Sequence, residues 1–275
     1  MSKQRLTITL STSTIKHVDQ LIDKKTIRSR SHAIESILQD YFQPSIQTAV
    51  LLAGGNSKSA EFKPLKPYKQ SPLINHLLAH LASYQIKKVI ILTNKQGNNL
   101  ETLLQKQFPK IKIKVVIEKN PLGTAGAIKS IAKLIQESFF CLHADIFTTI
   151  NLHEMATFHH SNQALATIAV KPKISHKAFD NVLLQGNRVE AFQPKNQDVD
   201  VSLVNSGIYI FEPAIVEAIP NIQKSTLEKD VFPKLANNKQ LYAYSFQGEW
   251  FDVDTEQEYL QDTKFITNKQ QSNEP

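Results

Sequence analysis

Two hydrophobic periodicities follow one another at the start of the chain. Residues 5–10 (Arg-Leu-Thr-Ile-Thr-Leu) carry an apolar side chain at every second position, which predicts a strand with one apolar and one polar face. Residues 15–22 and 34–41 carry apolar side chains three or four positions apart, which predicts two amphipathic helices. Ser11 can cap the first helix, and Pro44 ends the second.

One strand and two short helices bury little apolar surface by themselves. A segment of about 44 residues lies near the lower limit for independent folding. A single strand also has unpaired backbone edges, which the same strand of a second chain can pair with. We therefore expect residues 1–44 to form a small domain that is an obligate homodimer through its strand.

From Thr48 onward, apolar strands alternate with amphipathic helices. This order predicts an α/β fold with a mostly parallel, Rossmann-like sheet and right-handed crossovers over residues 48–265. Residues 266–275 are polar and are expected to be a frayed tail. The predicted strands cover 48–52, 88–93, 112–118, 139–145, 164–171, 180–192 and 203–211, and the predicted helices cover 73–83, 98–107, 124–136, 213–218, 227–236 and 255–264.

The composition is that of an ordinary globular protein. Hydrophobic residues make up 41% of the chain and charged residues 21%. No apolar run approaches the ~20 residues of a membrane span, and the start of the chain lacks the apolar core of a signal peptide. The single cysteine, Cys141, lies in an apolar run and is expected in the core. We therefore expect a cytoplasmic protein with no membrane partner.

Positive charge is concentrated in the first segment. The formal net charge of the chain is +7, and residues 1–44 hold seven Lys or Arg against four Asp or Glu. A basic face is typical of nucleic-acid binding, although a charge count alone is weak support.

Residues 3–42 resemble the ribbon-helix-helix family of small dimeric DNA-binding domains, and most of all its plasmid copy-control repressors. The resemblance covers the strand, the basic turn and the second helix beginning at Ser-Arg-Ser-His-Ala-Ile. It implies that two paired strands enter the major groove as a ribbon. The polar face of the strand, Arg5, Thr7 and Thr9, would then contact base edges.

The resemblance also implies a phosphate contact at the start of the second helix. Ser29 lies there, and backbone N–H groups at a helix N-terminus bind phosphate. Arg28 and Arg30 would add positive charge. The turn between the helices, residues 24–27, lacks the glycine usual in the family. A plainer interpretation is that the ribbon serves only for dimerisation.

An apolar strand from Ala49 runs into Gly54 and Gly55. Glycines let the backbone approach a phosphate closely, and ligands bind at the carboxyl end of the first strand in α/β folds. By itself the pair of glycines is also compatible with a simple tight turn.

Several ordered motifs resemble the sugar-1-phosphate nucleotidyltransferases. The match runs from about residue 48 to 264, and the Pro-Leu-Gly-Thr-Ala-Gly-Ala form is most like that of the mannose-1-phosphate and heptose-1-phosphate guanylyltransferases. The motifs are residues 51–55, Lys63-Pro64-Leu65, 71–74, Glu118 with 121–127, His143-Ala144-Asp145, 205–209, 228–235 and 250–255.

The resemblance implies a specific chemistry. An oxygen of a sugar 1-phosphate attacks the α-phosphate of a nucleoside triphosphate, expected to be GTP, and pyrophosphate leaves. Such a site stabilises charge with Mg²⁺ and positive donors instead of a protein nucleophile. Asp145 and Asp252 would bind Mg²⁺, and Lys63 would neutralise the phosphates.

Further residues take roles through the same resemblance. The nucleotide would contact the loop after the first strand and the segment that holds base and ribose, and the sugar phosphate would contact the later strands. The nucleotide-binding residues are Ala53, Gly54, Gly55, Lys58, Glu118, Pro121, Gly123, Thr124, Ala125 and Gly126, and the sugar-phosphate-binding residues are Gln193, Lys195 and Asn205.

The chain departs from the family pattern at its phosphate contacts. The Gly-Thr-Arg of the opening loop is missing, so Lys58 would replace an arginine that holds the phosphates. Gln193 replaces a lysine that contacts the sugar phosphate, and Lys195 could compensate. The closing motif has Asp254 in place of a glycine. Each lost charge-assisted contact costs about 1.5–3 kcal/mol.

Two hypotheses about function therefore stay open. In the first, the large domain is an active nucleotidyltransferase that the DNA-binding segment tethers or autoregulates. In the second, it is a nucleotide or nucleotide-sugar sensor whose ligand changes the affinity of the dimer for DNA. The retained aspartates favour the enzyme, and the altered phosphate loop with the attached DNA-binding segment favours the sensor.

Overall fold

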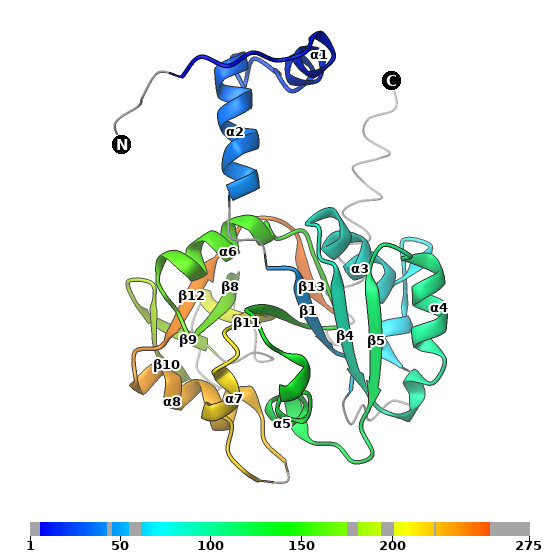
Figure 1. Cartoon of the computed structure of the whole chain (residues 1–275). Helices are drawn as coiled ribbons and strands as arrows, with labels where there is room; N and C mark the ends of the chain where they lie inside the picture. The colour runs from blue at the N-terminus through cyan, green and yellow to red at the C-terminus, as the bar shows by residue number, and fades with distance from the viewer. Residues whose placement is uncertain are drawn as a thin grey trace, which may run out of the picture. The chain divides into compact units, whose positions relative to one another are not determined.

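The chain divides into two compact units, Met1–Pro44 and Ser45–Pro275. A computed structural model gives their structures, and each unit is described by itself (Figure 1). The structure describes residues 6–42, 46–54, 62–174, 181–193, 201–222 and 224–253.

The first unit contains two helices, α1 (Thr12–Gln20) and α2 (Arg30–Phe42). The Oγ of Ser11 accepts a hydrogen bond from the N–H of Thr14 at 3.2 Å. The Oγ of Ser29 accepts one from the N–H of His32 at the same distance. Both predicted helices and the Ser11 cap are thus confirmed, and Ser29 caps the second helix.

A carboxylate holds the turn between the helices. One oxygen of Asp23 accepts hydrogen bonds from the N–H groups of Lys25, Thr26 and Ile27 at 2.7–2.9 Å, and these bonds hold the pKa of Asp23 below its ordinary value. Lys24 adopts a left-handed backbone with φ of 61°. Asp23 therefore stabilises a turn that glycine would form with less strain.

The strand predicted over residues 5–10 is not formed in the single chain. Arg5 lies outside the described residues, and residues 6–10 have no regular secondary structure. Leu6 is 79% exposed and Ile8 47% exposed. An isolated strand has no partner for its backbone N–H and C=O groups, so a single chain cannot form the predicted ribbon.

A nine-stranded sheet forms the centre of the second unit, in the order β5-β4-β1-β6-β11-β8-β12-β10-β9. Strands β5, β4, β1 and β6 are parallel, as predicted. The nine strands are β1 (Thr48–Leu52), β4 (Lys88–Thr93), β5 (Lys112–Ile117), β6 (Phe139–His143), β8 (Ala166–Ile174), β9 (Asn181–Gln185), β10 (Arg188–Gln193), β11 (Val201–Phe211) and β12 (Leu241–Ser245).

The other half of the sheet is mixed, so the prediction of a mostly parallel sheet was wrong there. Strand β11 runs antiparallel to β6, β8 and β9, and β10 runs antiparallel to β9 and β12. One reason is local. Gly186, with φ of +60°, and Asn187 form a two-residue turn that splits the predicted strand 180–192 into the hairpin β9–β10.

Helices cover both faces of the sheet. The predicted helix 73–83 is confirmed, but the one predicted over 124–136 stops at Ser130 and is followed by a 3-10 turn. The helix predicted over 255–264 and the tail 266–275 lie outside the described residues. The helices are α3 (Leu73–Ser83), α4 (Leu100–Gln107), α5 (Gly123–Ser130), α6 (Leu152–Ser161), α7 (Ile215–Ala218) and α8 (Phe232–Asn237), with a π-helical turn η4 (Leu227–Val231) before α8.

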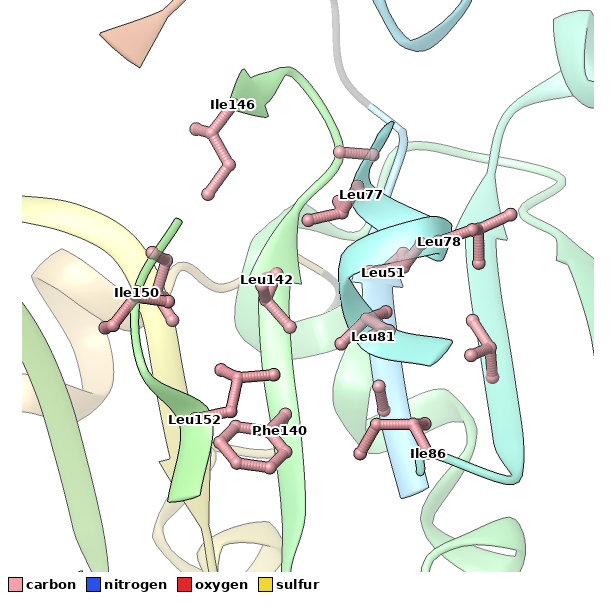
Figure 2. Packing of buried hydrophobic residues seen from close by; sticks show 14 of the residues in the cluster. Leu51, Leu77, Leu78, Leu81, Ile86, Phe140, Leu142, Ile146, Ile150 and Leu152 are labelled. Carbon is pink, nitrogen blue, oxygen red and sulfur yellow. The ribbon is translucent and has the colours of Figure 1, made fainter. Parts of the chain in front are cut away.

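Two apolar clusters flank the sheet. On one face, side chains of α3, α4 and α6 join those of the sheet in one cluster, with α4 against β5 and α6 against β8 and β12, and Figure 2 shows Leu51 and Leu142 of the sheet beside Leu77 and Leu81 of α3. On the other face, side chains of α5, α7 and α8 form the second cluster with the sheet, where α8 lies against β10 and β12. Cys141 is buried there, as predicted. In the described part of the chain, no helix has the length and apolar composition that crossing a bilayer requires.

Candidate active site

A cavity of about 170 Å³ lies where β1 and β4 end at their carboxyl edges. This is the edge at which ligands bind in open α/β sheets. Apolar side chains form part of the wall, and glycines and polar side chains form the rest. The lining residues are Leu52, Gly54, Leu92, Glu118, Pro121, Gly123, Thr124, Ala127, Lys224 and Thr226.

Glu118 brings a carboxylate to the cavity directly after β5. Its N–H donates to the carbonyl of Thr93 at 2.7 Å, which fixes the backbone. Burial raises the pKa of Glu118, and its Oε1 has no hydrogen-bond partner among the described residues. A Cβ on Gly54 would lie 3.0 Å from its other oxygen, so glycine at this position leaves room for the carboxylate.

The backbone at Gly123 can be formed only by glycine without strain. Its φ is +76°, and a Cβ there would lie 2.3 Å from the carbonyl oxygen of Ser225. That same oxygen accepts the N–H groups of Ala125 and Gly126 at 3.1 and 3.2 Å. Ala125 and Gly126 are not among the lining residues of the cavity, and their N–H groups bond within the protein.

The side chain of Thr124 also bonds within the protein. Its Oγ1 accepts the N–H of Leu227 at 2.8 Å and donates to Oε2 of Glu228 at 3.4 Å. Thr124 thus lines the cavity, but its hydroxyl makes contacts on the side of η4.

Two aspartates meet next to each other through a small sheet. Strand β7 (Ile146–Thr148) pairs with β13 (Trp250–Asp252), and Asp252 lies opposite Ile146. The N–H of Val253 donates to the carbonyl of Asp145 at 3.1 Å. Asp145 and Asp252, some hundred residues apart in sequence, are therefore neighbours in space.

Lys63 lies beside this pair, at the start of the 3-10 turn η1 (Lys63–Leu65). Its Nζ is 3.8 Å from Oδ2 of Asp145, and both side chains are about a quarter exposed. The three residues expected at the catalytic centre from sequence are thus gathered in one place, and solvent reaches them.

A second group of polar side chains lies along β11. Asn205 accepts the N–H of Gly207 through Oδ1 at 3.1 Å and donates from Nδ2 to the hydroxyl of Tyr209 at 3.0 Å. Gly207 has φ of +71°, and a Cβ there would lie 3.2 Å from the ring of His143. His143 packs edge-on against Tyr209, and its Nε2 has no partner among the described residues.

The structure gives less information on the other residues that were expected to bind the nucleotide or the sugar phosphate. Gly55, Lys58 and Lys195 lie outside the described residues. Gln193 ends β10 opposite Asn181, and its side chain is not described. Ala53 is buried, and its N–H donates to the carbonyl of Leu92.

Lys224 and Thr226 line the cavity and were not foreseen. The sequence feature near them is a threonine that can cap the start of a helix. In the structure the Oγ1 of Thr226 does cap η4, by accepting the N–H of Lys229. That pattern predicts a cap and says nothing about a distant cavity.

In the first unit, the expected DNA-contacting residues are exposed where they are described: Thr7, Thr9, Arg28, Ser29 and Arg30. Arg30 forms a two-pronged ion pair with Asp19 of α1, at 2.7 and 2.8 Å, which ties the two helices together. The Nε of Arg28 donates to the carbonyl of Lys25 at 3.4 Å.

The second unit has many relatives. The sequence profile of the nucleotidyl transferase family matches residues 48–269. A probable mannose-1-phosphate guanylyltransferase of Arabidopsis thaliana is 31% identical over 222 residues, which are 78% of this chain and 67% of that protein. The mannose-1-phosphate guanylyltransferase catalytic subunit beta of Danio rerio is 30% identical over 72% of this chain, which spans only 57% of that protein.

Solved structures share the fold. HddC from Yersinia pseudotuberculosis, solved alone and in complex with GMP-PN, superposes on 80% of this chain and all of its own length. The TM-scores are 0.68 and 0.69, and the sequence identities 23% and 21%. A UDP-glucose pyrophosphorylase in complex with UDP-glucose superposes on 82% of this chain and 99% of its own length, with a TM-score of 0.66 and 18% identity. With its profile match over most of its length, the chain belongs to the nucleotidyl transferase family.

Proposed function

We propose that the second unit transfers a nucleoside monophosphate from a nucleoside triphosphate to a sugar 1-phosphate and releases pyrophosphate. The observation that carries this proposal is that Asp145, Asp252 and Lys63 lie next to each other, in a unit that also has a cavity at the carboxyl edge of its sheet. The guanylyltransferases among its relatives support the same reaction class.

The two carboxylates fit a bound Mg²⁺. In the described part of the chain, no three His, Cys, Asp or Glu side chains form a complete metal site. Mg²⁺ typically takes one or two carboxylates and completes its shell with phosphate oxygens and water, so two aspartates are an adequate donor set. The ion would offset charge on the phosphates, while Lys63 would orient them as a point charge.

We further propose that GTP is the donor. Glu118 lines the cavity, and Oε1 of its carboxylate is buried without a hydrogen-bond partner in the described structure. Guanine presents two neighbouring N–H donors on one edge, which suits a carboxylate. The complex of HddC with GMP-PN is consistent with a guanine nucleotide in this fold.

Replacing Glu118 with Gln is expected to weaken GTP binding about tenfold, because an amide lacks the charge that strengthens both hydrogen bonds. UTP binding should change much less. Calorimetric titration with each nucleotide measures the effect, and Glu190→Gln, an exposed carboxylate on β10, is the matched control. An unchanged preference for GTP would contradict the assignment of Glu118.

The reaction itself is tested by pyrophosphate release. Purified protein would be assayed with Mg²⁺, the four nucleoside triphosphates and a panel of sugar 1-phosphates, with EDTA as the metal-free control. Metal-dependent turnover with one pair supports the enzyme and names its substrates. Nucleotide-sugar binding without turnover would instead favour a sensor. The missing Gly-Thr-Arg of the opening loop is the observation behind that second candidate.

For the first unit we propose a ribbon-helix-helix dimer that binds DNA. Among its described residues, Val18 and Ala33 are the buried apolar side chains, so the unit has little core of its own. A second copy would cover the exposed apolar residues and pair the two strands. These exposed residues are Leu6, Ile8, Leu21, Ile37 and Leu38.

Arg5→Ala is expected to lower specific DNA affinity by ~1–3 kcal/mol, because arginine can bond guanine through two hydrogen bonds. The binding site would first be selected from random DNA, and affinity would be measured at fixed salt. Lys16→Ala removes the same charge from α1 and should change affinity for all sequences by a similar, smaller amount. Unchanged specific affinity in Arg5→Ala would rule out base contact by this residue.

A further inference from the structure

Two residues of opposite charge line the cavity at the carboxyl edge of the sheet. Glu118 lines it from just after β5, and Lys224 lines it from the segment just before η4. Within the described part of the chain, the two do not form an ion pair, and neither side chain has another hydrogen-bond partner. The cavity therefore keeps an acceptor and a donor that a ligand can bind.

The hydroxyl groups that line the cavity bond within the protein instead. Oγ1 of Thr124 accepts the N–H of Leu227 at 2.8 Å. Oγ1 of Thr226 accepts the N–H of Lys229 at 3.4 Å. Each hydroxyl has a single proton, and both protons go to carboxylates of η4 at 3.4 Å. Polar recognition by side chains that line the cavity is thus left to Glu118 and Lys224.

The backbone next to Lys224 is fastened to the loop that borders the cavity. The N–H of Ser225 donates to the carbonyl of Leu122 at 2.9 Å, and the carbonyl of Ser225 accepts two N–H groups at the start of α5. The close approach of Gly123 to that carbonyl leaves no room for a Cβ. These contacts hold the backbone at Lys224 beside the cavity, while its exposed, flexible side chain can adjust to a ligand.

The cavity lies apart from the residues proposed to bind the metal and the phosphates. Lys63, Asp145 and Asp252 are not among its lining residues, whereas Glu118, the proposed contact of the base, is one of them. The position of Lys224 therefore groups it with the contact to the base.

We propose that Lys224 is a specificity-determining residue that donates to O6 and N7 of guanine, while Glu118 accepts the neighbouring N–H groups of the same base. The inference rests on the proposed use of GTP. Guanine presents two adjacent acceptors, O6 and N7, and lysine is one of the side chains that bind them. Adenine has an amino group in the place of O6, so the ammonium of Lys224 meets a donor there. Lys224 thus favours guanine and also opposes adenine.

The test measures the affinities of GTP, ITP and ATP for variants of the full chain, by calorimetry with Mg²⁺ and without an acceptor. Lys224→Met keeps a long side chain and removes its charge and its donors. We expect it to weaken GTP and ITP about tenfold each and to change ATP by less than about twofold, because the base of ITP keeps O6 and N7. Lys224→Arg keeps the donors and should retain most of the preference for guanine.

Lys133→Met is the matched control. Lys133 is an exposed lysine on the 3-10 turn η3 (Ala132–Leu134) and is not among the residues that line the cavity. Its replacement should leave all three affinities unchanged. Glu118→Gln separates the two contacts, because the base of ITP lacks the 2-amino group that a carboxylate can bind. This variant should weaken GTP more than ITP, whereas Lys224→Met should weaken both alike.

Equal weakening of all three nucleotides in Lys224→Met would overturn the proposal, since it would indicate a contact to ribose or phosphate. No weakening of any nucleotide would overturn it too, as would a wild type that binds GTP no more tightly than ATP. Pyrophosphate release by the wild type is measured separately. A protein that prefers GTP but releases no pyrophosphate would contradict the transfer reaction, while the affinities would still decide the role of Lys224.

Discussion

Replacing Asp145 or Asp252 with Asn is expected to lower kcat at least about a hundredfold, the scale of losing one preorganised electrostatic contact to a transition state. The amide keeps the size of the side chain but removes the negative charge that attracts Mg²⁺. Since β7 and β13 bring the two residues together, each single change should have nearly the full effect of the double change.

Pyrophosphate release under saturating Mg²⁺ measures this loss. Glu249→Gln provides the matched control, because Glu249 is an exposed carboxylate three positions before Asp252. A change in melting temperature on adding Mg²⁺ with nucleotide offers a second readout, and it should disappear in the aspartate variants alone. Full turnover in both Asp145→Asn and Asp252→Asn would mean that these residues do not hold the metal.

Gly123→Ala is expected to destabilise the second unit and to abolish nucleotide binding. A left-handed backbone costs a residue with a Cβ about 1–2 kcal/mol. The new Cβ would also lie 2.3 Å from the carbonyl oxygen of Ser225, so the segment at Ser225 or the start of α5 must shift. Both segments border the cavity. The loss of nucleotide-binding free energy should therefore exceed the loss of unfolding free energy.

Gly186→Ala separates the effect of the left-handed backbone from the effect of the close approach to Ser225. Gly186 has φ of +60°, but a Cβ there meets no atom within 4 Å. Thermal unfolding and nucleotide titration of both variants would be compared. Gly186→Ala should lose a little stability and no affinity. Equal behaviour of the two variants would show that the close approach at Ser225 is unimportant.

The most local parts of the fold were predicted well from sequence. Residues 48–52 and 73–83 form the expected strand and helix, because their periodicity and flanking residues decide their structure locally. The helix predicted over 124–136 ends early at Ser130, and 227–236 begins as a π-helical turn. In both places contacts with a distant segment compete with local preference.

The candidate site was predicted only in part, because some of its contacts join distant segments of the chain. The motifs place Glu118 and Gly123 at a cavity and Asp145 close to Asp252. They did not show that the hydroxyl of Thr124 bonds to η4, nor that Lys224 lines the cavity. The spacing of residues along the chain does not predict a contact between residues about a hundred positions apart.

The sequence by itself determined the alternation of strands and helices, the ordered motifs and the residue types of the site, because each follows from local periodicity or from a resemblance carried by neighbouring residues. Only the tertiary structure decided the antiparallel half of the sheet, the pairing of β7 with β13 and the hydrogen bonds that join Ser225 to the start of α5. These depend on hydrogen bonds and packing between distant segments, whose free energy is gained only when the whole unit folds.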